Sequence, residues 1–399
     1  MSASFRPISA AYFWYFALVG TIAPFLPDYF RLLGLNHAEI GLLVASVMVT
    51  KILAPNLWAI VADATGRRLR LIRVGISFAL VALLVFPMLE SFWPLLILMV
   101  FFSAFWNAVL PQFEVITLSA LREQGRQHHY SRIRLWGSVG FIAVVIGLGA
   151  VFEYFGLALL PYAMILLMAA LLWSSLMIHA PDSTGGMGFR DVLKVFTKEF
   201  KSIPIILFFI IAFLVQLSFG PYYTFFTIHL KNVGYSFDII GILWAVGVLA
   251  EVGLFLVMHR FLKSYSLRVL MLAALTLTAL RWWGIAELAD QVWLLLLFQL
   301  GHALSFGCVH AVSIEFVHRA FGRGSVAGQG QALYSAVSFG AGGAVGAWAS
   351  GQIAFHYSAG DTFYFAAASA AAAMLVLLLG WRSCGPETYW CRAVKAAPA

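Results

Sequence analysis

Long apolar runs, separated by short polar breaks, follow one another along almost the whole chain. A helix needs about 20 apolar residues to cross the hydrocarbon core of a bilayer. Twelve runs of suitable length lie near residues 8–32, 39–62, 71–89, 93–120, 133–152, 157–179, 203–230, 238–259, 269–286, 291–317, 326–355 and 362–381. Closed β-barrels would alternate polar and apolar positions instead. The pattern therefore predicts an all-α polytopic membrane protein with twelve transmembrane helices, the first of them uncleaved.

Composition supports the same fold class. Of the 399 residues, 62% are hydrophobic and 11% are charged, and the mean hydropathy is +0.91. Soluble domains carry about 25% charged residues, so a water-soluble fold is excluded. The net charge of +8 does not indicate nucleic-acid binding, because the basic residues are scattered through short interhelical loops. Three cysteines without CxxC spacing indicate neither a disulfide framework nor a metal site.

The longest polar stretch, near residues 180–202, divides the runs into six plus six. We therefore predict an N-terminal six-helix bundle (1–180), a cytoplasmic linker (181–202), a C-terminal six-helix bundle (203–382) and a cytoplasmic tail (383–399). A shift of 200 residues aligns the two halves and superposes identical residues at several positions. The same shift places Lys51 on Glu251. Such parallel repeats predict two pseudo-symmetric bundles, with a substrate site at the repeat interface near the midplane.

The placement of Lys and Arg predicts the orientation of the spans, because cytoplasmic loops hold the excess of these residues. If the N-terminus is cytoplasmic, nearly all loop cations fall on that side, and the opposite side keeps only Arg31 and Lys231. We therefore expect a multi-pass protein of the bacterial inner membrane with both termini in the cytoplasm.

A loop motif follows the second run. Asp63, Gly66, Arg67 and Arg68 resemble the G-x-x-x-D-R-x-G-R-R loop of the major facilitator superfamily of secondary transporters. Ala59 stands in place of the first glycine of that pattern, and Ala64 in place of its first basic residue. The expected role is structural: the aspartate holds a neighbouring helix terminus while the basic residues stay in the cytosol.

Within that superfamily, the chain resembles the branch of phenylpropionate permease, lactose permease and nucleoside/proton symporters. The resemblance is carried by residues 24–27 (PFLP), by Pro55 with Leu57 and Trp58, by residues 130–141 (YSRIRLWGSVGF) and by the pairs 302–303 and 306–307. It implies that Glu114 and Arg134 bind substrate and that Arg281 and His302 belong to the proton machinery. The acid that the branch carries three residues after this histidine is Ser305 here. We expect Glu251 to replace it.

Further polar groups within spans are candidates for the substrate site. Charges at the bilayer centre are costly and normally face a cavity or pair with one another. Lys51 is therefore expected to contact substrate. Gln112 and Asn107 could also contact substrate, or they could join helices by hydrogen bonds.

The favoured hypothesis is a secondary active transporter, a proton-coupled symporter that imports a small organic solute by alternating access. The solute is expected to be an aromatic carboxylate such as phenylpropionate, or a sugar or nucleoside. No cofactor is expected, because the proton gradient drives transport, and a monomer is expected to function in the bilayer.

The first alternative is an exporter that works as an antiporter. An integral-membrane enzyme would need motifs such as HExxH or GxSxG, which the sequence does not contain. A receptor without transport would be expected to carry an appended soluble domain.

Overall fold

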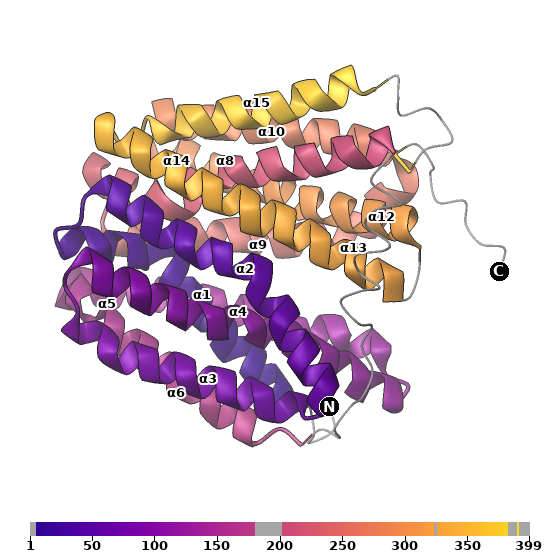
Figure 1. Ribbon diagram of the computed structural model, residues 1–399. Coiled ribbons are helices and arrows are strands. Elements are labelled where there is room, and N and C mark those ends of the chain that lie inside the picture. The colour runs from indigo at the N-terminus through magenta and orange to yellow at the C-terminus, as the bar shows by residue number, and fades with distance from the viewer. Residues whose placement is uncertain (1–4, 180–201, 323–324, 382–388, 391–399) are drawn as a thin grey trace. The chain divides into compact units, whose positions relative to one another are not determined.

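The computed structural model describes residues 5–179, 202–322, 325–381 and 389–390. Nearly all of the expected linker and of the expected tail lies outside these residues. The first half of the chain forms six long helices: α1 (Arg6–Leu32), α2 (His37–Thr65), α3 (Arg68–Val85), α4 (Phe92–Glu123), α5 (Tyr130–Phe155) and α6 (Leu160–Leu176). Short 3-10 turns precede α5 and α6 and follow α3. Figure 1 shows these helices in indigo to magenta.

The second half repeats this plan with two interruptions. Its segments are α8 (Ile203–Val233), α9 (Phe237–Ser264), α10 (Leu267–Glu287), α11 (Val292–Leu300), η4 (Ala303–Cys308), α12 (Val309–Phe321), α13 (Ser325–Ser335), η5 (Ala336–Gly342), α14 (Gly343–His356) and α15 (Thr362–Leu379). The segments η4 and η5 are π-helical. They interrupt two spans without ending them, so α11 to α12 and α13 to α14 each correspond to one predicted run.

The predicted all-α membrane fold is confirmed. Among the described residues, eleven helices are long and apolar enough to cross a membrane. The one remaining predicted span, 326–355, corresponds to the stretch from α13 to α14. The sequence shift of 200 residues is also visible in the backbone, because Gly34 and Gly234 both end a helix with positive φ, at 85° and 109°. A left-handed conformation of this kind favours glycine.

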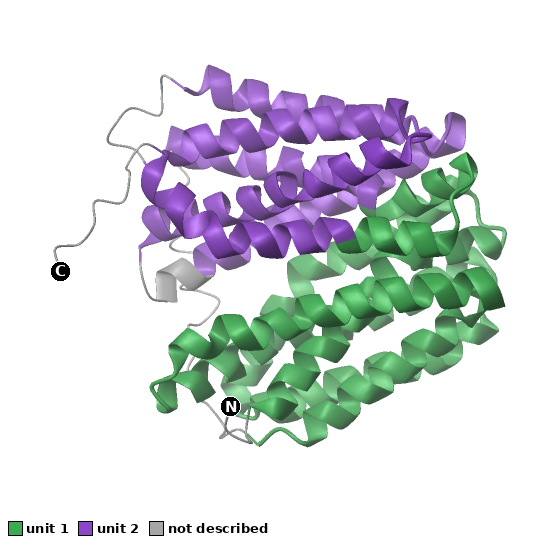
Figure 2. Cartoon of the chain, turned by 180° about the vertical axis from the view of Figure 1, so that it is seen from behind, with its two compact units in different colours: residues 1–186, 223–245 green, residues 187–222, 246–399 purple. Residues whose placement is uncertain are grey.

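The described helices group into two compact units (Figure 2). Unit 1 comprises residues 1–186 and 223–245, and unit 2 comprises residues 187–222 and 246–399. Segment 223–245, the end of α8 and the start of α9, joins unit 1 through polar contacts. Arg31 donates a hydrogen bond to Asn232 (2.9 Å), and Glu153 accepts one from the backbone N–H of Phe237 (2.7 Å). Glu153 also pairs with Lys231 at 3.8 Å.

Glycines bring α5 against α1 in unit 1. A Cβ added at Gly140 would lie 2.2 Å from the carbonyl oxygen of Phe13, and one added at Gly20 would lie 3.0 Å from that of Phe141. Lipid tails are as apolar as Leu, so helices in a bilayer associate through close van der Waals packing, which small residues permit. The glycines of α5 therefore fix its distance from α1.

The equivalent pair of helices in unit 2 uses the same device. A Cβ added at Gly220 of α8 would lie 2.2 Å from the backbone of Gly346 in α14. One added at Gly342 would lie 2.6 Å from the carbonyl oxygen of Phe213. Glycines therefore permit the close helix contact in both halves, and the two halves share one packing plan.

The close contact at Gly140 can be tested by adding a single methyl group. We expect Gly140→Ala to lower the free energy of unfolding by about 1–3 kcal/mol, because the added carbon overpacks a fixed backbone contact. The apparent melting temperature of the purified protein in detergent measures this effect. Gly147→Ala on the same helix is the matched control, because nothing lies within 4 Å of a Cβ there. Equal melting temperatures for the two variants would contradict the assignment.

Candidate functional site

Unit 1 brings together the two residues that the resemblance assigns to substrate binding. Arg134 Nε on α5 lies 4.0 Å from Glu114 Oε1 on α4. The side chains are 35% and 38% exposed, so both remain accessible to a solute. The guanidinium carbon of Arg134 also lies 4.1 Å from the ring centroid of Phe16 and 5.7 Å from that of Tyr12. The arrangement is a loosely paired cation beside aromatic rings.

A glycine makes room for this cation. A Cβ at Gly137, three residues after Arg134, would lie 2.6 Å from the Phe16 ring and 3.0 Å from Arg134 Nη1. The same face of α1 carries Tyr15, which stacks on Trp106 of α4 at 4.1 Å between centroids and 9° between planes. The Arg134 guanidinium therefore lies beside aromatic rings supplied by α1.

Asn107 joins two helices of unit 1. Its amide donates to the carbonyl oxygen of Val47 (2.9 Å) and to Thr50 Oγ1 (2.8 Å), which links α4 to α2. Thr50 also bonds Ser103 at 2.8 Å. Lys51 follows Thr50 on α2 and is partly buried. Roles for Asn107 and Lys51 in substrate binding stay predictions, and the observed contacts of Asn107 are those of helix pairing.

Gln112 lies with the loop motif rather than with Glu114. Arg68, 5% exposed, donates from one nitrogen to Gln112 and from another to Asp63, at 2.5 Å. This arginine begins α3 and Asp63 lies near the end of α2, so the aspartate holds a neighbouring helix start, as the motif implies. Gly66 caps α2 with φ of 66°. The amide oxygen of Gln112 already accepts a hydrogen bond from Arg68. A role for Gln112 in substrate binding stays a prediction.

In unit 2, Arg281 of α10 is the centre of a buried polar network. It is 1% exposed and donates hydrogen bonds to Ser305 Oγ (3.0 Å) and Gln299 Oε1 (2.7 Å). Gln299 donates in turn to the hydroxyl of Tyr222 at 3.3 Å. The guanidinium also lies over the rings of Tyr222 and Trp282, at 4.8 and 4.2 Å. Four helical segments thus converge on one cation.

Glu251 and His302 lie in the same unit, in contact with each other. His302 Nε2 is 3.6 Å from Glu251 Oε2, and the side chains are 7% and 19% exposed. Glycines border the pair: a Cβ at Gly307 would lie 3.2 Å from Glu251, and one at Gly247 would lie 3.4 Å from His302. Ser305, which stands where the branch has an acid, binds Arg281 and follows His302 by three residues. The three predicted proton-coupling residues therefore meet at the turn 302–305. His302 belongs to this turn, Glu251 contacts His302, and Arg281 binds Ser305.

Sequence reasoning did not find Gln299. It is fully buried, and its amide uses the oxygen for Arg281 and the nitrogen for Tyr222. The available signal was an isolated amide within the apolar run 291–317, because buried polar groups in a bilayer must find partners inside the protein. The segment η4 was also missed, since a π-helical stretch has no distinct apolar period.

Comparisons with known proteins agree with this architecture. The MFS_1 like family matches residues 5–365. A probable 3-phenylpropionic acid transporter of Escherichia coli (strain K12) is 26% identical over 349 residues, which cover 84% of this chain and 88% of the relative. A maltose permease of Geobacillus stearothermophilus is 26% identical over 379 residues and 92% of each chain.

Solved structures show the same fold. The nucleoside transporter NupG aligns with a TM-score of 0.83 at 18% identity, over 95% of this chain and 99% of its own. A bacterial homologue of the human lysosomal transporter Spinster aligns with a TM-score of 0.72 at 14% identity, over 95% and 96%. These relatives and neighbours are membrane transporters and not enzymes. With a family match over most of its length, the chain belongs to the MFS_1 like family of transporters, as its loop motif and repeats predict.

Proposed function

We propose that the protein is a proton-coupled symporter that imports a small organic carboxylate by alternating access, with an aromatic acid such as phenylpropionate as the first candidate. The observation that carries the proposal is the environment of Arg134. An arginine presents a planar fork of donors that matches a carboxylate. Arg134 is about one third exposed, its nearest acid is 4.0 Å away, and aromatic rings flank it. A carboxylate attached to an aromatic group fits such a setting.

Relatives support this class of substrate without limiting the choice to it. One relative is described as a probable 3-phenylpropionic acid transporter, and it covers most of this chain at 26% identity. The maltose permease and the nucleoside transporter keep a sugar and a nucleoside as alternatives. The exporter alternative uses the same residues with the opposite direction of coupling.

Proton coupling is assigned to unit 2. Ionisable residues within membrane spans are costly, and chains of Glu, Asp and His form proton relays in transporters. Glu251 and His302 are 3.6 Å apart, so a proton can pass between them with little movement. The buried Arg281 is joined to the same turn through Ser305 and adds a fixed positive charge. No cofactor is needed for this chemistry.

The orientation is proposed from the loop charges, with both termini in the cytoplasm of a bacterial cell and the protein in its inner membrane. Alkaline phosphatase fused after Gly186 should then be inactive, because the enzyme needs disulfides that form only in the periplasm. A fusion after Gly156, between α5 and α6, should be active and serves as the matched control. Phosphatase activity from the fusion at Gly186 would reverse the orientation.

Anion recognition is tested by a substitution that keeps the charge. We expect Arg134→Lys to weaken binding of 3-phenylpropionate by about tenfold or more, because Lys loses the planar two-point contact with a carboxylate. Equilibrium binding to the purified protein measures the loss. Arg132→Lys, two residues away at an exposed position, should bind as the unchanged protein does. Unaltered affinity in the Arg134 variant would remove this residue from the site.

Coupling is tested by a substitution that mimics a permanently protonated acid. We expect Glu251→Gln to abolish accumulation of substrate driven by a pH gradient, while exchange of labelled for unlabelled substrate continues, because exchange needs no proton release. Paired uptake and counterflow in vesicles measure both activities. Glu315→Gln is the control, since Glu315 pairs with Arg319 elsewhere in unit 2, at 2.8 Å. If the Glu251 variant still accumulates substrate, the coupling proton resides elsewhere and Glu114 is the next candidate.

A further inference from the structure

Trp390 lies in the expected cytoplasmic tail, yet its side chain is completely buried. Its exposed fraction is 0%, and it belongs to unit 2. Tryptophan is so large that it is rarely buried completely. A tail that only extended into the cytosol would leave this side chain in water. Its burial therefore means that this part of the tail packs against the protein.

The indole ring of Trp390 packs against both α8 and α12. Its centroid lies 4.7 Å from that of Phe316 on α12 and 6.1 Å from that of Phe208 on α8. Those two rings stack on each other, with 4.2 Å between centroids and 16° between planes. Trp390 therefore adds a third ring to a pair that already joins the two helices. Such ring pairs contribute beyond the area that they bury.

Hydrogen bonds from both sides hold the same two tail residues. The indole N–H of Trp390 donates to the carbonyl oxygen of Pro204 at 3.4 Å, and Arg319 donates to the carbonyl oxygen of Tyr389 at 3.3 Å. Arg319 is itself held by Glu315, at 2.8 Å. A buried tryptophan usually finds a partner for its N–H group. The protein thus binds the ring and the backbone of the tail together. We call the surface made by Pro204, Phe208, Phe316 and Arg319 the tail socket.

The rings of the tail socket are a feature of unit 2 alone. A shift of 200 residues places Phe208 on Ile8 and Phe316 on Ile116. These two isoleucines are buried in unit 1, with exposed fractions of 3% and 5%. The close glycine contacts recur in both units, whereas the ring pair does not. The rings therefore occur in the unit that carries the tail.

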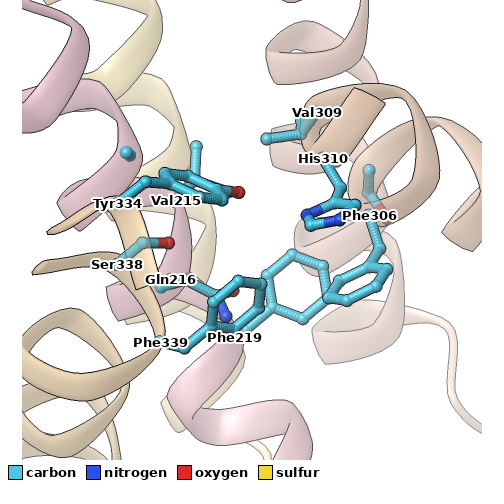
Figure 3. A pocket seen from close by; sticks show the side chains of 11 residues that line it. Val215, Gln216, Phe219, Phe306, Val309, His310, Tyr334, Ser338 and Phe339 are labelled. Carbon is cyan, nitrogen blue, oxygen red and sulfur yellow. The ribbon is translucent and has the colours of Figure 1, made fainter. Parts of the chain in front are cut away.

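The pocket of Figure 3 adjoins the tail socket but cannot take its place. Tyr334 lines this pocket, and its ring centroid lies 5.9 Å from that of Phe208. The pocket has room for about one water molecule, so a ring does not fit there. Of these two neighbouring sites, only the tail socket accommodates an aromatic side chain.

We propose that residues 389–390 form a strap that holds the start of α8 to the end of α12, with the tail socket as the binding site for the tryptophan. Pro204 and Phe208 lie in the first two turns of α8. The glycine contacts of this helix involve Phe213 and Gly220, further along. Helices in a bilayer depend on such specific contacts, because apolar burial does not drive their association. The strap supplies one where the glycines do not reach. This inference does not use the proposed function.

Hydrogen exchange and melting temperature of the full-length purified protein test the strap. We expect Trp390→Ala to raise the exchange rates of the amides of residues 205–208 by about tenfold or more, because the first turns of α8 then open locally. The N–H groups of Ile205 and Ile206 bond to the carbonyl oxygen of Ser202 and report on this opening. The apparent melting temperature should fall by about 5 °C or more.

Two further variants serve as controls. Trp293→Ala makes the same change in unit 2 at a side chain that is 80% exposed, and it should leave exchange at 205–208 unchanged. Trp390→Phe keeps a ring in the socket and should lose much less than Trp390→Ala. If Trp390→Ala behaves as Trp293→Ala does, there is no strap. Equal acceleration along the whole of α8 would make Trp390 a general packing residue and would also overturn the proposal.

A double-mutant cycle tests whether the tail ring and the socket act together. We expect the loss of melting temperature in Trp390→Ala with Phe316→Leu to be smaller than the sum of the single losses, because the two changes remove the same contact. Additive losses would overturn the tail socket. Trp390→Leu replaces Trp390→Ala in every comparison if the alanine variant does not fold. Neither measurement needs a substrate, so failure of the strap leaves the proposed function untouched.

Discussion

A guanidinium within a membrane span must be solvated by the protein, because hydrocarbon offers it no partner. The core of unit 2 is arranged around this constraint at Arg281. Gln299 and Ser305 accept its hydrogen bonds, and Tyr222 and Trp282 present their ring faces to it. These groups come from α8, α10, α11 and η4, so each of these segments must keep its register for the charge to remain satisfied. The network therefore links helix packing to the position of the neighbouring turn that carries His302.

Packing between helices obeys a second constraint, since apolar burial does not drive association inside a bilayer. In both units, glycines permit the close contact that this constraint requires. Gly140 lets α5 approach α1, and Gly346 lets α14 approach α8. The repeat that is visible in the sequence is therefore also present in the helix contacts of the two units.

Much of the fold could be predicted from the sequence, because spans are limited by the thickness of the bilayer and marked by apolar runs. The candidate site was harder to predict from the sequence. Roles for Glu114, Arg134, Glu251 and His302 were predicted from the resemblance and from the cost of buried charge, but the contacts of Glu114 with Arg134 and of Glu251 with His302 were not. Sequence could not show that Gln112 serves the loop motif, because residues 44 positions apart meet only through tertiary packing. The π-helical segments could not be predicted either, since one extra residue per turn does not change the hydropathy of a span.

The two intramembrane arginines differ in the property that separates a structural cation from a binding cation. Arg281 is 1% exposed and has its hydrogen bonds supplied by protein groups, so an incoming anion would have to displace Gln299 or Ser305. Arg134 is 35% exposed, and its carboxylate partner lies 4.0 Å away, beyond the range of a strong charge-assisted hydrogen bond. The rings of Phe16 and Tyr12 lie beside the guanidinium, and Tyr130 is hydrogen-bonded to it. Of these two arginines, Arg134 is therefore the one whose donors an incoming anion could reach at the lower cost, and Arg281 is the one that keeps the turn with His302 and Ser305 in register.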